Sequence, residues 1–427
     1  MKLLVIGSGG REHALAWKLK QSRRVSEVIV APGNAGTARE HGVRNADVAA
    51  TDVDGLIRLA RDEGVALAVV GPEAALAVGV VDQFRAAGLR CFGPSRTAAQ
   101  LESSKAYAKA FLARHNIPTA RHAVFEELAP ALAHVRRHGA PIVIKADGLA
   151  AGKGVVVALT LADAEQTLHD MLGAQSFGAA SARVVIEECL SGEEASYIVM
   201  SDGRDVLPLA TSQDHKRRDE GDLGPNTGGM GAYSPAPVVT PAIEQRILTE
   251  IVRPTIAGMA AEGAPYIGFL YVGLMIGADG TPRVIEFNAR LGDPETQPIL
   301  LRLESDLVDL VEDALDGRLA GRAAEWDPRP ALGVIVAAAG YPGKVRSGDV
   351  ISGLERAEAQ GAKVFHAGTG VDAEGRVVTT GGRVLAVCAL GEDLAAAREQ
   401  AYAAVREIRF DGAFHRRDIG HRALPRS

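Results

Sequence analysis

Cysteine is scarce in this chain of 427 residues, which contains only Cys91, Cys189 and Cys388. The three lie far apart in sequence, and none has a second Cys or a His at the short spacing of zinc sites. This pattern disfavours a disulfide framework and a Cys/His metal centre. It indicates reduced thiols, and we therefore expect a cytoplasmic protein.

The chain also lacks an excess of positive charge and a long hydrophobic run. Lys plus Arg number 47 against 53 for Asp plus Glu, a net charge of −6, so no overall field attracts nucleic acid or an anionic membrane. The first apolar run ends before Gly7, and this run is too short for a signal sequence or a membrane span. We therefore expect neither nucleic acid nor a membrane as a partner.

What is present is the composition of a folded globular protein. Hydrophobic residues make up 47% of the chain and charged residues 23%, which excludes a largely disordered chain. A chain of this length usually forms roughly two to four domains.

The first predicted domain spans residues 1–103 and is Rossmann-like. Short apolar segments at 3–6, 28–31 and 67–70 alternate with the helical patterns 11–21 and 76–87. This alternation predicts an open parallel sheet with crossover helices.

The second predicted domain spans residues 104–327, and its first helix ends before Pro118. Residues 120–195 are predicted to form a small β-rich lobe. Residues 213–235 have no periodicity and many polar side chains, so we expect a functional loop. Strands at 268–276 and 283–287 flank a Gly-containing turn and predict a hairpin.

The third predicted domain, residues 328–427, follows a proline-rich linker. Apolar segments at 332–338, 364–366 and 384–387, followed by an alanine-rich helix, predict a small α+β domain. The predicted fold class is therefore a multidomain α/β and α+β protein.

The turn Gly7 to Glu12 follows the first strand and resembles a dinucleotide-binding turn, because glycines let a phosphate approach backbone N–H groups. The third position of that fingerprint is Glu12, and no carboxylate ends the second strand, so a nicotinamide site is disfavoured. Gly9 and Gly10, together with the later Asn34, are instead expected to hold a small phosphorylated substrate.

The segment from Lys145 to Gly154 carries a stronger signal for phosphate binding. Its glycines, which include Gly152, free backbone N–H groups, while Lys145 and Lys153 supply compact positive charge. The Walker spacing is absent and a β-branched run follows, so this loop is predicted to join two strands.

Two acidic segments follow along the chain. Residues 184–194 form an apolar strand that leads into a carboxylate-rich linker. Glu286 and Asn288 lie two apart on one strand and therefore on one face, where they offer the hard oxygen ligands that Mg²⁺ prefers. Arg290 continues that face.

These segments, in this order and spacing, resemble the ATP-grasp superfamily. The blocks GGREHALAW, APGNAGT, KADGLAAGKGV, TSQDHKR, GPNTGGMGAYSP, EFNARLGDPETQ and RRDIG further resemble the phosphoribosylamine–glycine ligase family and cover nearly the whole chain. The family often has Cys and Phe where this chain has Ala289 and Leu291. Many ATP-grasp relatives also carry a metal carboxylate on the preceding strand, but residues 271–276 contain none.

The resemblance implies a central ATP-grasp domain, ATP as co-substrate, and Mg²⁺ or Mn²⁺ as metal. It implies that the residues contacting ATP are Lys105, Lys145, Gly152, Lys153, Gly154, Glu187 and Glu194. It implies Glu286 and Asn288 as metal ligands and Arg290 as the catalytic residue. The residues implied for the phosphoribosylamine and glycine sites are Gly9, Gly10, Asn34, Asp214, Lys216, Asp293 and Glu295.

The reaction implied is ATP-dependent ligation of glycine to 5-phosphoribosylamine, a step of purine biosynthesis, through glycyl phosphate and by a monomer. Three alternatives remain open: a sister ATP-grasp enzyme that uses another carboxylate, a nucleotide-sensing module without turnover, and a dehydrogenase. Glu286, Asn288 and Arg290 together disfavour the sensing module, because binding alone does not require all three.

Overall fold

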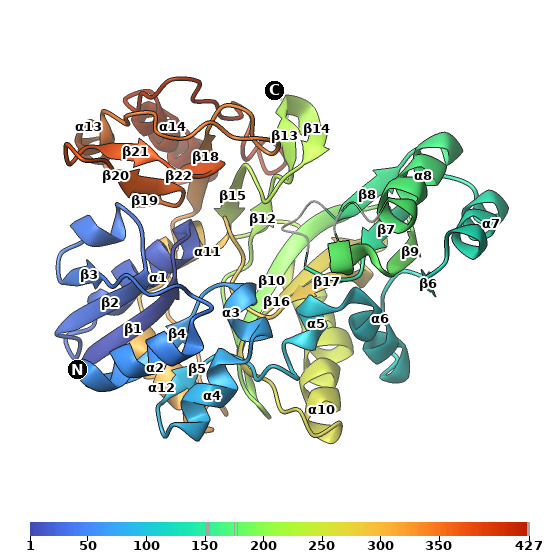
Figure 1. The fold of residues 1–427 in the computed structure, drawn as a ribbon, viewed down its shortest axis with the longest axis horizontal. Helices are drawn as coiled ribbons and strands as arrows, with labels where there is room; N and C mark the ends of the chain where they lie inside the picture. The colour runs from blue at the N-terminus through green and yellow to red at the C-terminus, as the bar shows by residue number, and fades with distance from the viewer. Residues whose placement is uncertain (150–153, 175, 177, 425–427) are drawn as a thin grey trace.

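The computed structural model describes residues 1–149, 154–174, 176 and 178–424. Four parts are visible in Figure 1: the N-terminal sheet, a central sheet, a lobe at one side, and the C-terminal sheet above. The predicted multidomain fold class is confirmed. Among the described residues, no helix combines the length and apolarity needed to cross a bilayer.

The N-terminal part is a five-stranded parallel sheet in the order β3-β2-β1-β4-β5, as the alternation predicted. Its strands are β1 (Lys2–Gly7), β2 (Glu27–Pro32), β3 (Val43–Asn45), β4 (Val65–Val70) and β5 (Cys91–Phe92). Its helices are α1 (Gly10–Lys20), η1 (Thr37–Arg39), α2 (Val53–Asp62), α3 (Glu73–Ala77) and α4 (Val80–Ala86).

The prediction of one continuous helix in this part is wrong, because the chain forms two helices there. The pattern over 76–87 predicted a continuous helix, but the chain forms α3 and α4 with a break at Gly79, whose φ is +82°. A glycine adopts this left-handed conformation without steric cost, and it ends the helical hydrogen bonding.

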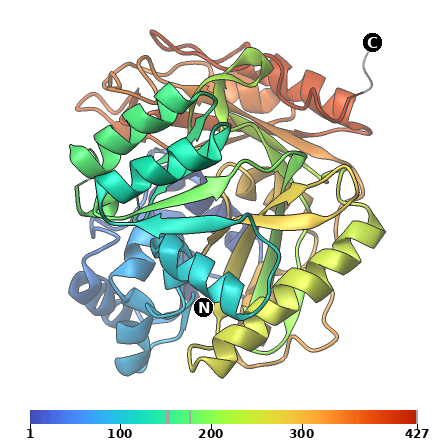
Figure 2. The same cartoon turned by 90° about the vertical axis from the view of Figure 1, so that its right-hand side faces the viewer.

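The lobe is a four-stranded antiparallel sheet in the order β6-β9-β7-β8. Its strands are β6 (His122–Phe125), β7 (Ile142–Ala146), β8 (Val155–Ala158) and β9 (Val184–Glu188). The helices α7 (Leu128–His138) and α8 (Leu161–Leu168) cover one face, followed by the turns η2 (His169–Gly173) and η3 (Gly178–Ser181) (Figure 2). The short α5 (Gln100–Ser103) and α6 (Lys105–Arg114) precede it.

The lobe has a hydrophobic core of its own, separate from the cores of the other parts. Val135 of α7, Ile144 of β7 and Ile186 of β9 are among the residues of this core. A separate core lets the lobe behave as one body.

The central sheet has the order β11-β10-β16-β17 and is antiparallel. Its strands are β10 (Glu193–Asp202), β11 (Val206–Pro208), β16 (Ile267–Ile276) and β17 (Pro282–Asn288), and the last two form the predicted hairpin. The helical run α9 (Pro241–Arg246), η5 (Ile247–Val252) and α10 (Arg253–Ala261) packs on it. Glu193 and Glu194 begin β10, whereas the sequence predicted a linker.

The C-terminal sheet, in the order β12-β15-β18-β22-β19, draws strands from two regions of the chain. The strands β18 (Ala331–Ala337), β19 (Lys363–His366) and β22 (Arg383–Leu390) and the helix α14 (Leu394–Val405) match the prediction. The other elements of this region are α11 (Thr296–Arg302), α12 (Leu307–Leu315), α13 (Leu354–Ala359), β20 (Thr369–Val371) and β21 (Val377–Thr379).

The predicted loop 213–235 is not irregular throughout, which corrects that expectation. It contains β12 (Gln213–Asp214), β13 (Arg217–Asp219), η4 (Glu220–Asp222), β14 (Leu223–Asn226) and β15 (Gly231–Ser234). The strands β12 and β15 join the C-terminal sheet, because β15 pairs with β18. Their sequence shows no apolar alternation because both strands are short and their pairing partners lie far along the chain.

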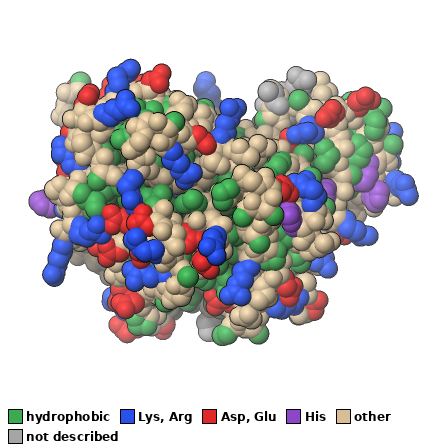
Figure 3. Space-filling model, turned by 90° about the horizontal axis from the view of Figure 1, so that it is seen from below, with side chains coloured by type: hydrophobic (Ala, Val, Ile, Leu, Met, Phe, Trp, Pro, Cys, Tyr) green, Lys and Arg blue, Asp and Glu red, His purple; other side chains and the backbone are tan. Residues whose placement is uncertain are grey.

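The N-terminal and central parts share one packed interior. Phe92 of β5 and Phe269 of β16 meet edge to face with their ring centroids 5.0 Å apart. A Cβ on Gly268 would lie 2.8 Å from Cδ of Pro94, so this glycine allows the two sheets to approach closely. The face seen from below carries Lys and Arg interspersed with Asp and Glu, without a patch of one sign (Figure 3).

Candidate active site

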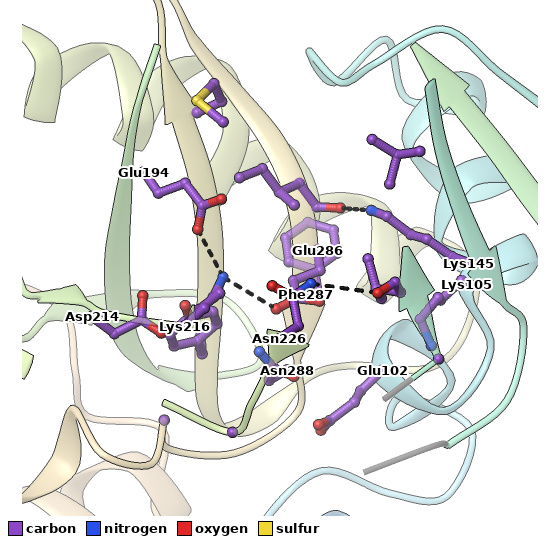
Figure 4. Close-up of a pocket in the computed structure, with 18 of the residues that line it drawn as sticks. Glu102, Lys105, Lys145, Glu194, Asp214, Lys216, Asn226, Glu286, Phe287 and Asn288 are labelled. Atoms are coloured by element: carbon purple, nitrogen blue, oxygen red, sulfur yellow. Dashed lines mark hydrogen bonds and ion pairs between the residues drawn. The ribbon is translucent and has the colours of Figure 1, made fainter. Parts of the chain in front are cut away.

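One cavity of about 640 Å³ lies between the lobe, the central sheet and the C-terminal sheet. A volume of this size accommodates a nucleotide-sized ligand. Figure 4 shows Lys105 and Lys145 at one side of it, Glu194 and Lys216 at the other, and Glu286 between them.

The cavity brings together most of the predicted site residues. Those that line it are Lys105, Lys145, Gly154, Glu187, Glu194, Asp214, Lys216, Glu286, Asn288, Arg290, Asp293 and Glu295. Gly9, Gly10 and Asn34 are not among the lining residues. Gly152 and Lys153 lie outside the described residues.

Two buried lysines hold one carboxylate at the lobe side. Lys145 on β7 and Lys109 on α6 each place Nζ 2.8 Å from a carboxylate oxygen of Glu187 on β9. Lys145 also donates to the backbone oxygen of Ile285 at 2.9 Å. Burial alone would raise the pKa of Glu187, but the two lysines lower it. The Lys145 ammonium is therefore held in one position beside β17.

Lys105 is the first residue of α6 and lies next to the start of the β7–β8 loop. Its Nζ donates to the backbone oxygen of Gly148 at 3.1 Å. The carboxylate of Asp147 accepts from the backbone N–H of Ala106 at 2.7 Å and from the hydroxyl of Ser104, the N-cap of α6. These contacts fix the beginning of the glycine-rich loop to a helix N-terminus, where an anion is favoured.

Glu286 and Asn288 lie on the cavity face of β17, as the spacing predicted. Lys216 places Nζ 3.0 Å from Glu194 and 3.9 Å from Glu286 (Figure 4). Burial alone would raise the pKa of Glu286, but Lys216, Lys145 and Lys105 lower it. An ionised carboxylate and an amide oxygen facing one cavity form a donor set that fits Mg²⁺ or Mn²⁺, with phosphate and water completing the shell.

Arg290 is held by two carboxylates that sequence reasoning missed. Its Nη2 lies 2.8 Å from Glu102 and its Nε 3.3 Å from Glu73, and Arg11 lies 3.9 Å from the same Glu73 carboxylate. Burial raises the pKa of Glu102 to about 7, and its carboxyl also accepts from the backbone N–H of Ala289 at 2.7 Å. The guanidinium of Arg290 is thus oriented in the cavity before any ligand binds.

A signal for Glu73 exists in the sequence. It follows Gly71 and Pro72 directly after the apolar strand β4. Polar residues just beyond the carboxyl ends of parallel strands commonly bind ligands. Glu102 and Arg11 have no comparable local signal.

Asp293 and Glu295 extend the site toward the C-terminal sheet. Asp293 accepts from Gln297 at 3.0 Å, and Glu295 accepts from Ser196 at 3.0 Å. Arg383 of β22 donates to the backbone oxygen of Asp293 at 2.6 Å. Arg383 was missed, although it follows a Gly-Gly pair at the start of an apolar strand.

Asp214 is buried and lines the cavity together with Lys216. Burial raises its pKa to about 7. Burial alone would lower the pKa of Lys216, but Glu194 and Asp214 raise it well above its ordinary value. Other lining residues that the sequence did not single out are Lys109, Asn226, Thr227 and Arg422.

Gly9, Gly10 and Asn34, the predicted phosphate site, contact other parts of the protein. A Cβ on Gly10 would lie 2.5 Å from Nε2 of Gln297, so Gly10 allows α1 to approach α11. Asn34 donates to the backbone oxygens of Ser8 and His366, each at 2.9 Å. Their role toward a substrate stays a prediction.

Comparison with known families gives matches along almost the whole chain. The phosphoribosylglycinamide synthetase N domain matches residues 1–102, the ATP-grasp (A) domain of the same family residues 103–296, and its C domain residues 331–422.

Individual relatives agree with these matches. The chain is 63% identical to the phosphoribosylamine–glycine ligase of Allochromatium vinosum and 64% identical to that of Xanthomonas axonopodis pv. citri, in each case over 100% of this chain and 99% of the relative. The crystal structure of the Thermotoga maritima phosphoribosylamine–glycine ligase is similar with a TM-score of 0.85 and 34% identity, covering 98% of this chain and all of that one. Biotin carboxylase from Campylobacter jejuni, at 15% identity and a TM-score of 0.70 over 96% of this chain and 92% of that one, shares the fold.

Proposed function

The chain belongs to the phosphoribosylglycinamide synthetase family, and we propose the following roles for its residues in the reaction. The reaction joins glycine to 5-phosphoribosylamine with ATP and yields glycinamide ribonucleotide, ADP and phosphate, a step of purine biosynthesis. The observation that carries the assignment of roles is one cavity lined by Lys105, Lys145, Glu286, Asn288 and Arg290.

Lys105 and Lys145 bind the phosphates of ATP, together with the glycine-rich loop that contains Gly152, Lys153 and Gly154. The buried pairing of Lys145 with Glu187 supports this role, because it presets the ammonium before the nucleotide arrives. Glu187 and Glu194 lie toward adenine and ribose, where carboxylates accept from amino and hydroxyl groups.

Glu286 and Asn288 hold a divalent cation, Mg²⁺ or Mn²⁺. When bound, the cation neutralises charge on the phosphate oxygens. The lowered pKa of Glu286 supports this role, because an ionised carboxylate is the ligand such a cation requires.

In the first step, the glycine carboxylate attacks the γ-phosphorus of ATP, ADP leaves, and glycyl phosphate forms. In the second, the amine of 5-phosphoribosylamine attacks the acyl carbon and phosphate leaves. Arg290, preset by Glu73 and Glu102, stabilises the charge on the transferred phosphoryl group. No protein nucleophile is needed.

The substrates occupy the end of the cavity toward the N- and C-terminal parts. Asp214, Lys216, Asp293 and Glu295 contact glycine or phosphoribosylamine, and Gly9, Gly10 and Asn34 contribute at the N-terminal turn. The lobe, residues 120–195, closes over the acyl phosphate and excludes water that would hydrolyse it. Its separate core supports this movement.

We further propose domain boundaries at 103/104 and 327/328, a monomer, and a cytoplasmic location. All three cysteines are free thiols, as a reducing compartment favours. Light scattering on the purified protein tests the monomer.

The test of function is phosphate release from ATP and Mg²⁺ with 5-phosphoribosylamine generated in place, with and without glycine, while product mass is followed. Phosphate and glycinamide ribonucleotide that appear only with both substrates support the proposal. Turnover without glycine, or only with another small carboxylate, moves the chain to a sister ATP-grasp reaction.

A further inference from the structure

The segment 416–422 near the C-terminus, here called the tail segment, lies against the region that carries Lys216. Asp222 stands at the centre of this contact. Its carboxylate lies 2.8 Å from Nη1 of Arg416 and 2.7 Å from Nη2 of Arg422. Arg416 is 1% exposed, so its charge is compensated within the protein and not by solvent.

The tail segment contacts the backbone on both sides of Lys216. Arg422 donates to the backbone oxygen of Asp214 at 3.2 Å, and Arg416 donates to that of Arg217 at 3.0 Å. The N–H of Gly420 donates to Nε2 of His215 at 3.0 Å. Residues at −2, −1 and +1 relative to Lys216 are therefore all fixed from one segment.

The same cluster does not fit a metal site. Possible ligand atoms of His215, Asp222 and His421 lie within 4.8 Å of one another. Nε2 of His215 accepts a hydrogen bond, so the neutral ring carries its proton on Nδ1, the atom that faces Asp222 at 3.6 Å. That nitrogen has no lone pair for a cation, and Asp222 already pairs with two guanidinium groups.

The fixed backbone has a consequence for the cavity. Lys216 lies just after the short strand β12 and has a long, flexible side chain. Such a side chain loses conformational entropy when its ammonium is held in one place. Its Nζ nevertheless lies between Glu194 and Glu286, at 3.0 and 3.9 Å. A backbone that is fixed on both sides restricts where the ammonium can reach.

We propose that the tail segment is a positioning element for Lys216, acting through the ion pairs of Asp222 with Arg416 and Arg422. It holds the Lys216 ammonium beside Glu286, where the phosphates of ATP are transferred. This inference rests on the proposed function of the cavity, and it gives residues 416–422 a role in the reaction.

The first experiment compares Asp222→Asn and Arg416→Lys with the unaltered protein in the complete assay. Asp222→Asn keeps the side-chain shape but removes the charge, and Arg416→Lys keeps the charge but loses the guanidinium that bonds to Asp222, to Asp418 and to the backbone oxygen of Arg217. Each is expected to lower kcat/KM for glycine, measured at saturating ATP, by about 10- to 100-fold, because misplaced catalytic groups cost rates of this order. Arg417→Ala, on the same segment with an 84% exposed side chain, is the control and leaves activity unchanged.

The second experiment separates positioning from general stability. The same two substitutions are made in a Lys216→Met background, in which the ammonium to be positioned is gone. If the tail segment acts through Lys216, they change the residual kcat/KM by less than about twofold there, as expected for residues that act as a unit. An equal loss in both backgrounds overturns the inference.

The outcomes also distinguish the two proposals. Lys216→Met with wild-type turnover refutes the role of Lys216 and with it the positioning role of the tail segment. Impaired Lys216→Met together with unimpaired Asp222→Asn and Arg416→Lys refutes only the tail segment. Thermal unfolding shows whether Asp222→Asn or Arg416→Lys fails to fold. If one of them does, the kinetics of the other test the role of the tail segment.

Discussion

At the residue scale, the site is built from charges that compensate one another before any ligand binds. Lys109, Lys145 and Glu187 are each less than 5% exposed in their side chains, and Glu187 is shared by both lysines. Removing one member of such a set leaves an uncompensated buried charge. Substitutions at these positions therefore change the orientation of the remaining groups as well as the total charge.

We predict that Lys145→Met raises KM for ATP and lowers kcat, with a combined loss in kcat/KM of at least about 100-fold, because a preset phosphate ligand is lost. Steady-state kinetics at varied ATP measures this. Lys344→Met, at an exposed position of the C-terminal part, is the matched control. Unchanged ATP kinetics in Lys145→Met would count against the phosphate-binding role of this lysine.

We predict that Glu286→Gln lowers kcat by at least about 100-fold and raises the Mg²⁺ concentration needed for half-maximal activity, because the amide is a weak ligand for a hard cation. The fold stays intact, since Glu286 lines a cavity. Arg283→Gln on the exposed face of the same strand is the control. Full activity of Glu286→Gln at low Mg²⁺ would refute the metal role of Glu286.

At the element scale, the connection between the lobe and the central sheet is a short turn. The strand β9 ends at Glu188 and β10 begins at Glu193. Gly192 has a φ of +150°, and a Cβ there would lie 2.1 Å from the backbone oxygen of Ile276. The turn therefore presses directly against the end of β16, and only glycine fits.

We predict that Gly192→Ala destabilises the protein through this collision as well as through backbone strain. Gly139→Ala is the matched control, because Gly139 has a φ of +75° but nothing within 4 Å of its added Cβ. The control is expected to cost about 1–3 kcal/mol from backbone strain alone, and Gly192→Ala at least about twice that. Urea unfolding measures both, and equal losses would contradict the collision argument.

At the scale of the whole molecule, the N-terminal and C-terminal parts are joined by a partly buried polar contact. Glu40 accepts from Nε2 of His13 at 3.1 Å and pairs with Lys363 of β19. The N–H of His366 donates to Nδ1 of the same His13 at 2.8 Å. Two parts that are distant in the sequence are thereby held together.

This contact predicts a pH dependence of stability. Burial alone would raise the pKa of Glu40, but the bonds to His13 and Lys363 lower it from 4.5 to about 2. A carboxylate with a lowered pKa stabilises the folded protein above its ordinary pKa, and this stabilisation is lost as pH falls from 4.5 to about 2.

The measurement is thermal unfolding of the unaltered protein and Glu40→Gln as a function of pH. The unaltered protein is expected to unfold a few degrees higher at neutral pH, and the difference is expected to close below about pH 4. Glu374→Gln, with an exposed surface pair to Arg376, is the control. A difference that stays constant from neutral to acid pH would refute the pKa argument.

Local elements of the fold, and the types of residue that the site contains, could be predicted from the sequence. The alternating apolar segments predicted the parallel sheet, the Gly-containing turn predicted the hairpin β16–β17, and the two-residue spacing placed Glu286 and Asn288 on one face. Periodicity and turn residues act over a few positions, so they are visible without the fold. They did not reveal the break at Gly79, because a left-handed glycine leaves the apolar pattern of both flanking helices intact.

Contacts between residues that are distant in the sequence are set by the tertiary structure. Arg290 is oriented by Glu73, 217 positions away, and Asp222 is paired with Arg416, 194 positions away. Such pairs depend on how sheets and helices pack, and no local pattern in the sequence encodes them. The short strands β12 and β15 likewise form only because a strand of the C-terminal part, β18, lies beside them, and this packing brings the loop that carries Lys216 to the cavity.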